Sequence, residues 1–261
     1  MIDLLLRVDF IRKKLLFHLK HKYFHELGHS IPLQSGYWAH LLEKDSYDSF
    51  SEIFIKQEYL EFIPDEPISR ILDIGAHYGY FSLWLQSLNS GIELESLMIE
   101  PCLTCHDSID LLIKNNKLKG FSHILDGAID DPTLAHASFF DRPFMASSSF
   151  QNSKTEEFRK IQIITEDDIV KKMPPPYDLI KCDIEGKEWE LLLHYPKVLS
   201  GAKHLILEWH SWHNGGGSLT QITEKLQEFG FSILKSSDTT KALGREGEVG
   251  LFLAENLSFN R

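Results

Sequence analysis

The chain has 261 residues, of which 43% are hydrophobic and 25% are charged, as in an ordinary globular protein. This composition excludes a disordered, collagen-like or disulfide-scaffold protein, and the length indicates one large domain or one domain with a small appendage. The 27 Lys and Arg against 38 Asp and Glu give a net charge of −11, which disfavours DNA or RNA as a partner. Residues 1–29 differ from the rest, because six basic and three acidic residues give them a charge of +3.

The sequence carries no signal for export or membrane insertion. No stretch approaches the roughly 20 apolar residues that span a bilayer. The apolar start is interrupted by Asp3, Arg7 and Asp9, and it lacks the positive leading region and cleavage site of a secretion signal. Three cysteines do not make a disulfide framework. We therefore expect a cytoplasmic protein without a transmembrane segment.

Residues 1–64 are expected to form a helical extension, or cap, ahead of a main domain at residues 65–261. Apolar residues recur at helical spacing over residues 3–27, with Lys and Arg between them. A second helix is expected over residues 46–62, ended by Pro64 and Pro67. Because the first helix separates its apolar and basic residues imperfectly, packing or a lid is favoured over lipid contact. Pairing with a second copy of the chain stays open.

Strands and helices alternate from Arg70 onward. Seven main strands are expected over residues 70–74, 96–100, 123–125, 177–182, 204–208, 231–234 and 249–253. Helices are expected over residues 79–88, 103–117, 187–194 and 219–229, and an irregular stretch adds short strands at 137–140 and 160–164. The alternation predicts an α/β fold with a doubly wound, mostly parallel seven-stranded sheet. Ligands of such sheets bind beyond the carboxyl ends of the strands.

The first strand of this region leads into a glycine loop, Asp73-Ile74-Gly75-Ala76-His77-Tyr78-Gly79, and then into a helix. Glycine allows positive φ and close approach of a ligand to the backbone, and the helix start offers unpaired N–H groups. A dinucleotide loop would read Gly-x-Gly-x-x-Gly. An acid ahead of the glycines would repel a pyrophosphate but suits a ligand with an ammonium and a sulfonium. The loop therefore predicts S-adenosylmethionine as cofactor, bound by Asp73, Gly75, Ala76, His77 and Gly79.

Acidic residues also lie at the carboxyl ends of the second and third expected strands of this region. Glu100 ends the second strand, where a carboxylate accepts hydrogen bonds from both ribose hydroxyls of a bound nucleoside. Asp126 follows the third strand, within reach of the adenine amino group. Pro101 and Gly127 come directly after these acids and complete the expected cofactor site, together with Asp183 after the fourth strand.

These motifs resemble the class I S-adenosylmethionine-dependent methyltransferases and, within them, the FkbM family. The finer match is carried by Tyr177-Asp178-Leu179-Ile180-Lys181-Cys182-Asp183-Ile184-Glu185-Gly186-Lys187-Glu188, which is similar to the family's Asp-Leu-Ile-Lys-Ile-Asp-Val-Glu-Gly-x-Glu stretch. Ile163–Asp168 resembles the Thr-Leu-Asp segment that precedes it, and Ile99-Glu100-Pro101 resembles the family's Glu-Pro pair. The resemblance covers roughly residues 65–255.

The resemblance implies methyl transfer from S-adenosylmethionine, most often to a hydroxyl oxygen of a sugar, glycan or secondary-metabolite acceptor. Such a hydroxyl must lose its proton to a base within hydrogen-bond reach. The candidates for this catalytic role are Asp183, after the fourth main strand, Glu208, at the end of the fifth, and His210 just beyond it.

The same three residues allow a metal hypothesis. Asp183, Glu208 and His210 offer carboxylate and imidazole ligands that suit a divalent cation, which would acidify the acceptor hydroxyl. Trp209 and Trp212 equally suit a wall of the acceptor pocket. A loop with partly exposed histidines and no metal is the favoured reading.

Two other functions remain open. The chain could bind the cofactor without turnover and act as an interaction scaffold. A nicotinamide oxidoreductase is the third hypothesis, and the missing first glycine of the dinucleotide loop disfavours it.

Overall fold

The computed structural model describes residues 9–23, 26, 30–33, 35–89, 91–139, 159–211, 218–241 and 247–259. Of the expected features, Phe140 and Trp212 lie outside these ranges, as do the ends of the helix expected over residues 3–27. Within the described ranges, no helix is both long and apolar enough to cross a bilayer.

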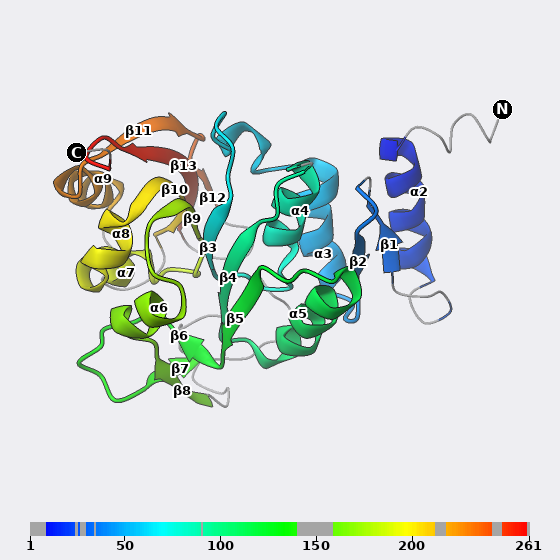
Figure 1. The fold of residues 1–261 in the computed structure, drawn as a ribbon, viewed down its shortest axis with the longest axis horizontal. Coiled ribbons are helices and arrows are strands. Elements are labelled where there is room, and N and C mark those ends of the chain that lie inside the picture. The colour runs from blue at the N-terminus through cyan, green and yellow to red at the C-terminus, as the bar shows by residue number, and fades with distance from the viewer. Residues whose placement is uncertain are drawn as a thin grey trace.

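A seven-stranded path forms the central sheet (Figure 1). In spatial order its strands are β11 (Phe231–Ser236), β13 (Glu248–Asn256), β10 (Ala202–His210), β9 (Tyr177–Cys182), β3 (Arg70–Ile74), β4 (Glu95–Glu100) and β5 (Phe121–Leu125). The strands from β10 to β5 run parallel, whereas β13 is antiparallel to both β10 and β11. The two-residue strand β12 (Thr240–Lys241) pairs with β13 outside this path. The expected mostly parallel seven-stranded sheet is confirmed.

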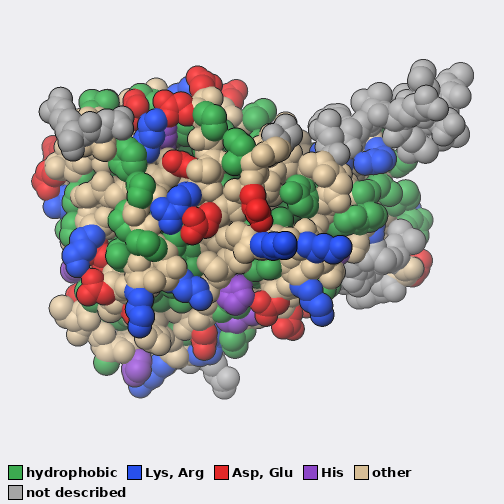
Figure 2. Space-filling model, viewed as in Figure 1, with side chains coloured by type: hydrophobic (Ala, Val, Ile, Leu, Met, Phe, Trp, Pro, Cys, Tyr) green, Lys and Arg blue, Asp and Glu red, His purple; other side chains and the backbone are tan. Residues whose placement is uncertain are grey.

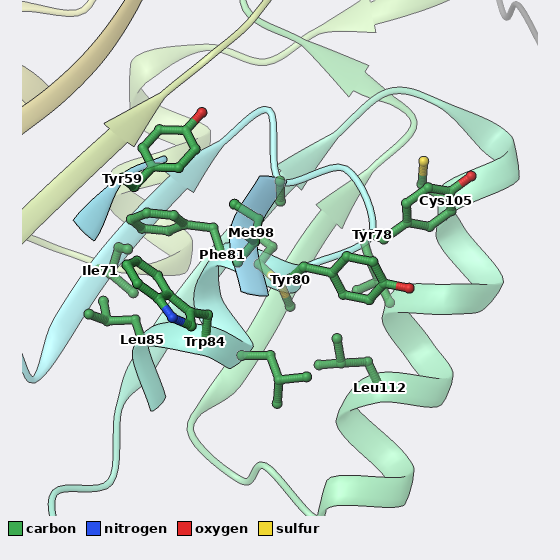
Figure 3. Packing of buried hydrophobic residues seen from close by; sticks show 14 of the residues in the cluster. Tyr59, Ile71, Tyr78, Tyr80, Phe81, Trp84, Leu85, Met98, Cys105 and Leu112 are labelled. Atoms are coloured by element: carbon green, nitrogen blue, oxygen red, sulfur yellow. The ribbon is translucent and has the colours of Figure 1, made fainter. Parts of the chain in front are cut away.

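Two hydrophobic layers cover the two faces of the sheet. Successive side chains of a strand point to opposite faces of the sheet, so Ile71 and Leu72 of β3 belong to different hydrophobic clusters, one on each face. The Ile71 cluster includes α4 (Tyr80–Leu88) and α5 (Leu103–Asn116). The Leu72 cluster includes α6 (Glu166–Lys172), α7 (Glu188–His194), α8 (Pro196–Ser200) and α9 (Leu219–Glu228). Figure 3 shows the first layer, in which Phe81 and Trp84 of α4 lie beside Ile71.

The segment before the sheet is more broken than the sequence pattern indicates. It holds α2 (Asp9–Lys22), a hairpin of β1 (Ser30–Pro32) and β2 (Trp38–His40), α3 (Ser46–Phe50), the π-helix η1 (Ser51–Lys56) and the 3₁₀-helix η2 (Leu60–Phe62). One continuous helix over residues 46–62 was therefore wrong. Gln57 ends η1 with a left-handed φ of 57°. Tyr47, Phe50 and Phe54 are buried in the Ile71 cluster, so packing against α4 overrides helical periodicity here.

A small second sheet lies beyond β5. It orders β6 (Gly127–Ala128), β8 (Arg159–Ile163) and β7 (Ala137–Phe139), with β6 parallel and β7 antiparallel to β8. These strands agree with the short ones expected at 137–140 and 160–164, within the described residues. Through β6 and β8 this sheet fixes the chain that follows Asp126.

Candidate active site

The candidate site lies where β3 and β9 are neighbours and the chain order of the sheet reverses. Open α/β sheets bind their ligands at this switch point, beyond the carboxyl ends of the strands. Asp183 follows β9, and its N–H donates to the carbonyl of Ile74 at 3.0 Å. The glycine loop and Asp183, expected from separate motifs, are thus adjacent.

Close backbone packing shapes the glycine loop. Gly75 has a φ of +75°, and a Cβ there would lie 1.7 Å from the carbonyl oxygen of Asp183, so only glycine fits. Gly79, with a φ of +73°, is the N-cap of α4. Between them His77 is also left-handed, with a φ of 56°, and its Nδ1 lies 3.1 Å from Oγ of Ser49. Burial holds the pKa of His77 well below its usual value, so its ring is neutral.

Asp73 lies beneath this loop with none of its surface exposed. Its Oδ2 accepts a 2.7 Å hydrogen bond from Oγ of Ser82, and its Oδ1 lies 3.7 Å from Nζ of Lys181. Burial raises the pKa of Asp73. Burial also opposes the charge of Lys181, but Asp183 and Asp73 hold its pKa above the usual lysine value. Lys181 donates to the carbonyl of Gly75 at 2.7 Å, so Asp73 acts on the loop through this lysine.

Glu100 ties the glycine loop to the start of α5. Its Oε2 accepts from the N–H of His77 at 2.6 Å, and its Oε1 accepts from the N–H of Cys102 at 2.7 Å. The N–H groups of Gly75 and Ala76 both donate to the carbonyl of Ile99, the preceding residue, at 3.0 Å. Burial raises the pKa of Glu100 to about 8. Each carboxylate oxygen has a second lone pair, so Glu100 keeps accepting capacity for a ligand.

Asp126 and Pro101 share one partner that the sequence motifs did not reveal. Arg159, at the start of β8, pairs with the Asp126 carboxylate and donates to the Pro101 carbonyl at 2.5 Å. The Asp126 side chain is 60% exposed, in contrast to the buried Asp73. Gly127 is buried in β6, where a Cβ would meet Ile164 at 2.5 Å. Arg159 thus joins the segments that follow β4 and β5.

Asp183, Glu208 and His210 come together at the ends of β9 and β10. Nε2 of His210 lies 4.0 Å from Oδ1 of Asp183 and 3.8 Å from Oε1 of Glu208. The strand expected to end at Glu208 extends to His210, which puts these two residues on one face at a spacing of two. Nδ1 of His210 lies 2.9 Å from Oε1 of Glu188, a buried residue of α7.

Burial and neighbouring charges give these groups different protonation states. Burial and the Asp183 charge raise the pKa of Glu208 to about 7. Burial opposes the charge of His210, but Glu188, through its charge and hydrogen bond, raises the pKa of this imidazole to about 10. At neutral pH, therefore, His210 is a cation that donates to Glu188, and Glu208 is poised to exchange a proton.

Tyr59 is a member of the site that sequence reasoning missed. Its hydroxyl donates to Oε2 of Glu208 at 2.6 Å and lies 3.5 Å from Oδ2 of Asp183. Tyr59 is only 6% exposed and comes just after η1, outside the strand-end pattern that revealed the acids. An aromatic residue in a broken helical segment gave no signal of this role.

The spacing of side chains at this cluster also allows a metal ligand set. Ligand atoms of Asp183, Glu185 and His210 lie within 4.8 Å of one another. Nδ1 of His210 faces Glu188, so only its Nε2 is directed toward Asp183 and Glu208. The carboxylates of the site equally suit a ligand of net positive charge such as S-adenosylmethionine.

The sheet order, with its antiparallel strand β13 next to β10, and the glycine loop after β3 define the fold of the class I S-adenosylmethionine-dependent methyltransferases. The sequence model described as the methyltransferase FkbM domain matches residues 73–233. The chain belongs to the FkbM family of methyltransferases, whose methyl donor is S-adenosylmethionine, and the resemblance seen in its motifs is confirmed.

The chain is similar to several solved structures. The methyltransferase FkbM from Methylobacillus flagellatus is 16% identical, with a TM-score of 0.51, over 93% of this chain and 53% of that one. This chain therefore spans about half the length of that relative. TYW2 from Pyrococcus horikoshii, in complex with MeSAdo, is 11% identical, with a TM-score of 0.49, over 88% of this chain and 72% of that one. No curated protein matches the sequence.

Proposed function

We propose that this chain is an O-methyltransferase that methylates a hydroxyl group of a sugar, glycan or secondary-metabolite acceptor. The observation that carries the proposal is the cluster of Asp183, Glu208 and His210 beside the glycine loop. Glu208 has a pKa of about 7, which suits a general base that works near neutral pH. Family membership supports methyl transfer, and the cluster supports an acceptor that must lose a proton.

The proposed cofactor site joins the segments at the carboxyl ends of four strands, β3, β4, β5 and β9. S-adenosylmethionine supplies an activated methyl group on a sulfonium, which is transferred by in-line displacement. The residues that would hold it are Asp73, Gly75, Ala76, His77, Gly79, Glu100, Pro101, Asp126, Gly127 and Asp183. Glu100 would accept from the ribose hydroxyls with its remaining lone pairs, and Asp126 would face the adenine. Asp73 would act indirectly, because it lies beneath the loop.

In the proposed reaction Glu208 takes the proton of the acceptor hydroxyl. Tyr59 holds Oε2 of Glu208 by its hydrogen bond and so orients the carboxylate. His210, as a cation fixed by Glu188, stabilises the negative charge of Glu208 and Asp183. The cluster thus positions a proton acceptor beside the cofactor loop, and positioning supplies much of the rate of such displacements.

The test has two parts. Calorimetry with S-adenosylmethionine and with NAD distinguishes a methyltransferase site from an oxidoreductase site, and we expect binding of the first only. Formation of S-adenosylhomocysteine is then measured over a panel of sugar, glycan and polyketide-type hydroxyl acceptors. A chain that binds the cofactor but turns over no acceptor would be an interaction scaffold instead.

Glu208→Gln tests the assigned base. This variant keeps the shape of the side chain but removes its proton-accepting capacity, so kcat should fall by about 10²–10⁴ while cofactor affinity stays similar. Glu224→Gln, on the exposed side of α9, is the matched control. An unchanged kcat in Glu208→Gln would remove Glu208 from the mechanism.

A further inference from the structure

The basic helix α2 attaches to the protein by one face. Phe17 stacks on Phe50 with ring centroids 5.9 Å apart and contacts Tyr47 at 5.6 Å. His21, one helical turn further on, meets the same Tyr47 ring at 5.6 Å. Figure 1 shows α2 at the end of the molecule opposite α9. The helix also contacts β1 and η1, so its attached side faces these elements and α3, and only the opposite side points away from the body.

An apolar stripe runs along the outward face of α2. Its members, spaced four residues apart, are Ile11, Leu15, Leu19 and Tyr23, with exposed fractions of 38%, 45%, 41% and 38%. Residues four apart in a helix lie one above the other, so these side chains form a continuous row. The N–H of Tyr23 donates to the carbonyl of Leu19 at 3.0 Å, which extends the last turn to include it. Figure 2 shows hydrophobic side chains gathered over α2.

The charge of α2 is opposite to that of the rest of the chain. Its 14 residues include five Lys or Arg and one Asp, a net charge of +4, whereas the whole chain carries −11. Lys14 and Lys22 are exposed beside the stripe. Lys22 Nζ lies 5.3 Å from the ring centroid of Tyr23. Lysines at such a border keep their ammonium in water while their stems cover apolar surface.

We propose that α2 docks this protein on an anionic lipid bilayer, with the stripe in the interfacial layer and the lysines at the headgroups. A bilayer of this kind offers an apolar layer and negative charge in the same plane, which matches the two features of the outward face. A second copy that used the same face would bring two helices of charge +4 together, which is repulsive. The sequence pattern favours packing or a lid for this helix, but packing in the structure leaves the row of Ile11, Leu15, Leu19 and Tyr23 exposed.

The experiment is co-sedimentation of the full chain with phosphatidylcholine vesicles, with and without about one quarter phosphatidylglycerol. We expect binding to the anionic vesicles only, and weaker binding when salt rises from about 0.1 M to about 0.5 M. The variants Leu15→Glu and Leu19→Glu should each weaken binding by about tenfold or more, and Lys22→Glu should weaken it at low salt. Leu234→Glu, at a 50% exposed leucine of β11, is the matched control.

Each outcome decides the question. Binding that requires phosphatidylglycerol and is lost in the stripe variants, with far-UV circular dichroism unchanged, supports the proposal. It is overturned if neither vesicle binds the chain, or if Leu15→Glu and Leu19→Glu bind as well as Leu234→Glu does. The proposal is also overturned if the chain does not bind vesicles but forms a dimer that becomes monomeric in the stripe variants. That result would show that a second copy of the chain covers the outward face of α2.

Discussion

The Tyr59 hydroxyl donates a 2.6 Å hydrogen bond to Oε2 of Glu208, a residue 149 positions further along the chain. Tyr59 precedes the region that matches the FkbM family model, residues 73–233, whereas Glu208 lies inside it. The segment ahead of the sheet is therefore part of the candidate active site. This segment also reaches the glycine loop, because Ser49 of α3 lies 3.1 Å from the His77 ring.

Removal of the Tyr59 hydroxyl should change the pH dependence of turnover. The hydrogen bond from Tyr59 stabilises the ionised form of Glu208, so Tyr59→Phe should raise the pKa of Glu208 above about 7. A hydrogen bond to a charged group contributes about 1.5–3 kcal/mol, which corresponds to a shift of about one to two pH units. The acid limb of the kcat/KM profile should move to higher pH by this amount. Tyr23→Phe, on the exposed stripe, is the control, and coincident profiles would contradict the role of Tyr59.

Loss of the buried lysine should weaken the fold and the cofactor loop together. Lys181 is 4% exposed, lies near Asp73 and Asp183, and donates to the Gly75 carbonyl. Lys181→Met leaves Asp73 as an unpaired buried charge, so the free energy of unfolding should fall by about 3–5 kcal/mol. Urea denaturation measures this change, with Lys171→Met on the surface of α6 as control. If the free energy of unfolding falls no more in Lys181→Met than in Lys171→Met, the ion pair of Lys181 with Asp73 contributes little to stability.

Gly75→Ala should disrupt the glycine loop in two ways, through a steric clash of the new Cβ and through strain in the left-handed backbone. Its Cβ would lie 1.7 Å from the Asp183 carbonyl oxygen, so β3 and β9 would have to separate at the site. Gly36 in the β1–β2 hairpin also has a positive φ, +85°, but nothing lies within 4 Å of its added Cβ. Gly36→Ala therefore isolates the backbone strain, about 1–2 kcal/mol. Calorimetry should show that Gly75→Ala no longer binds S-adenosylmethionine, whereas Gly36→Ala binds it as the unmodified chain does. Equal affinities of the two variants would contradict the close packing of Gly75 against the Asp183 carbonyl.

Cofactor binding should release protons near neutral pH. Burial raises the pKa of Glu100 to about 8, and burial with the Asp183 charge raises that of Glu208 to about 7, so both are partly protonated there. A ligand of net positive charge favours their ionised forms and lowers both pKa values. Affinity for S-adenosylmethionine should then rise with pH between about 6 and 8. Calorimetry in buffers of different ionisation enthalpy counts the protons; uptake of protons would be the opposite of this expectation.

Much of the sheet could be predicted because its strands are buried on both faces and read as apolar runs between helices. The acids at their ends followed from the same pattern. The face of the sheet on which the Asp73 side chain lies could not be predicted, because it depends on the pleat of β3. Asp73 lies on the same face as Ile71, where it accepts a hydrogen bond from Ser82 of α4, and it pairs with Lys181 in the register of β3 and β9. A one-residue change in where a strand begins moves the side chain to the other face.

The site partners from outside the sheet were also beyond prediction. Arg159 reaches Asp126 and Pro101 from β8, and Glu188 reaches His210 from α7. These contacts join residues far apart in sequence and depend on how helices and the small sheet dock. Local periodicity carries no information on such docking, so a helix was expected over residues 46–62 where the structure has three short elements.

The π-helix η1 makes the length of this stretch as important as its residues. A π-helix closes its hydrogen bonds over one residue more than an α-helix does. Loss of one residue from Ser51–Lys56 would let an ordinary helical turn replace the wider one, with little change in the direction of the chain that follows. Insertion of one more residue would instead turn that chain by about 100°, the angle per residue of an α-helix, and Tyr59 would point away from β10. Insertions between Phe50 and Gln57, which leave every side chain of the sheet intact, should therefore remove one wall of the active site.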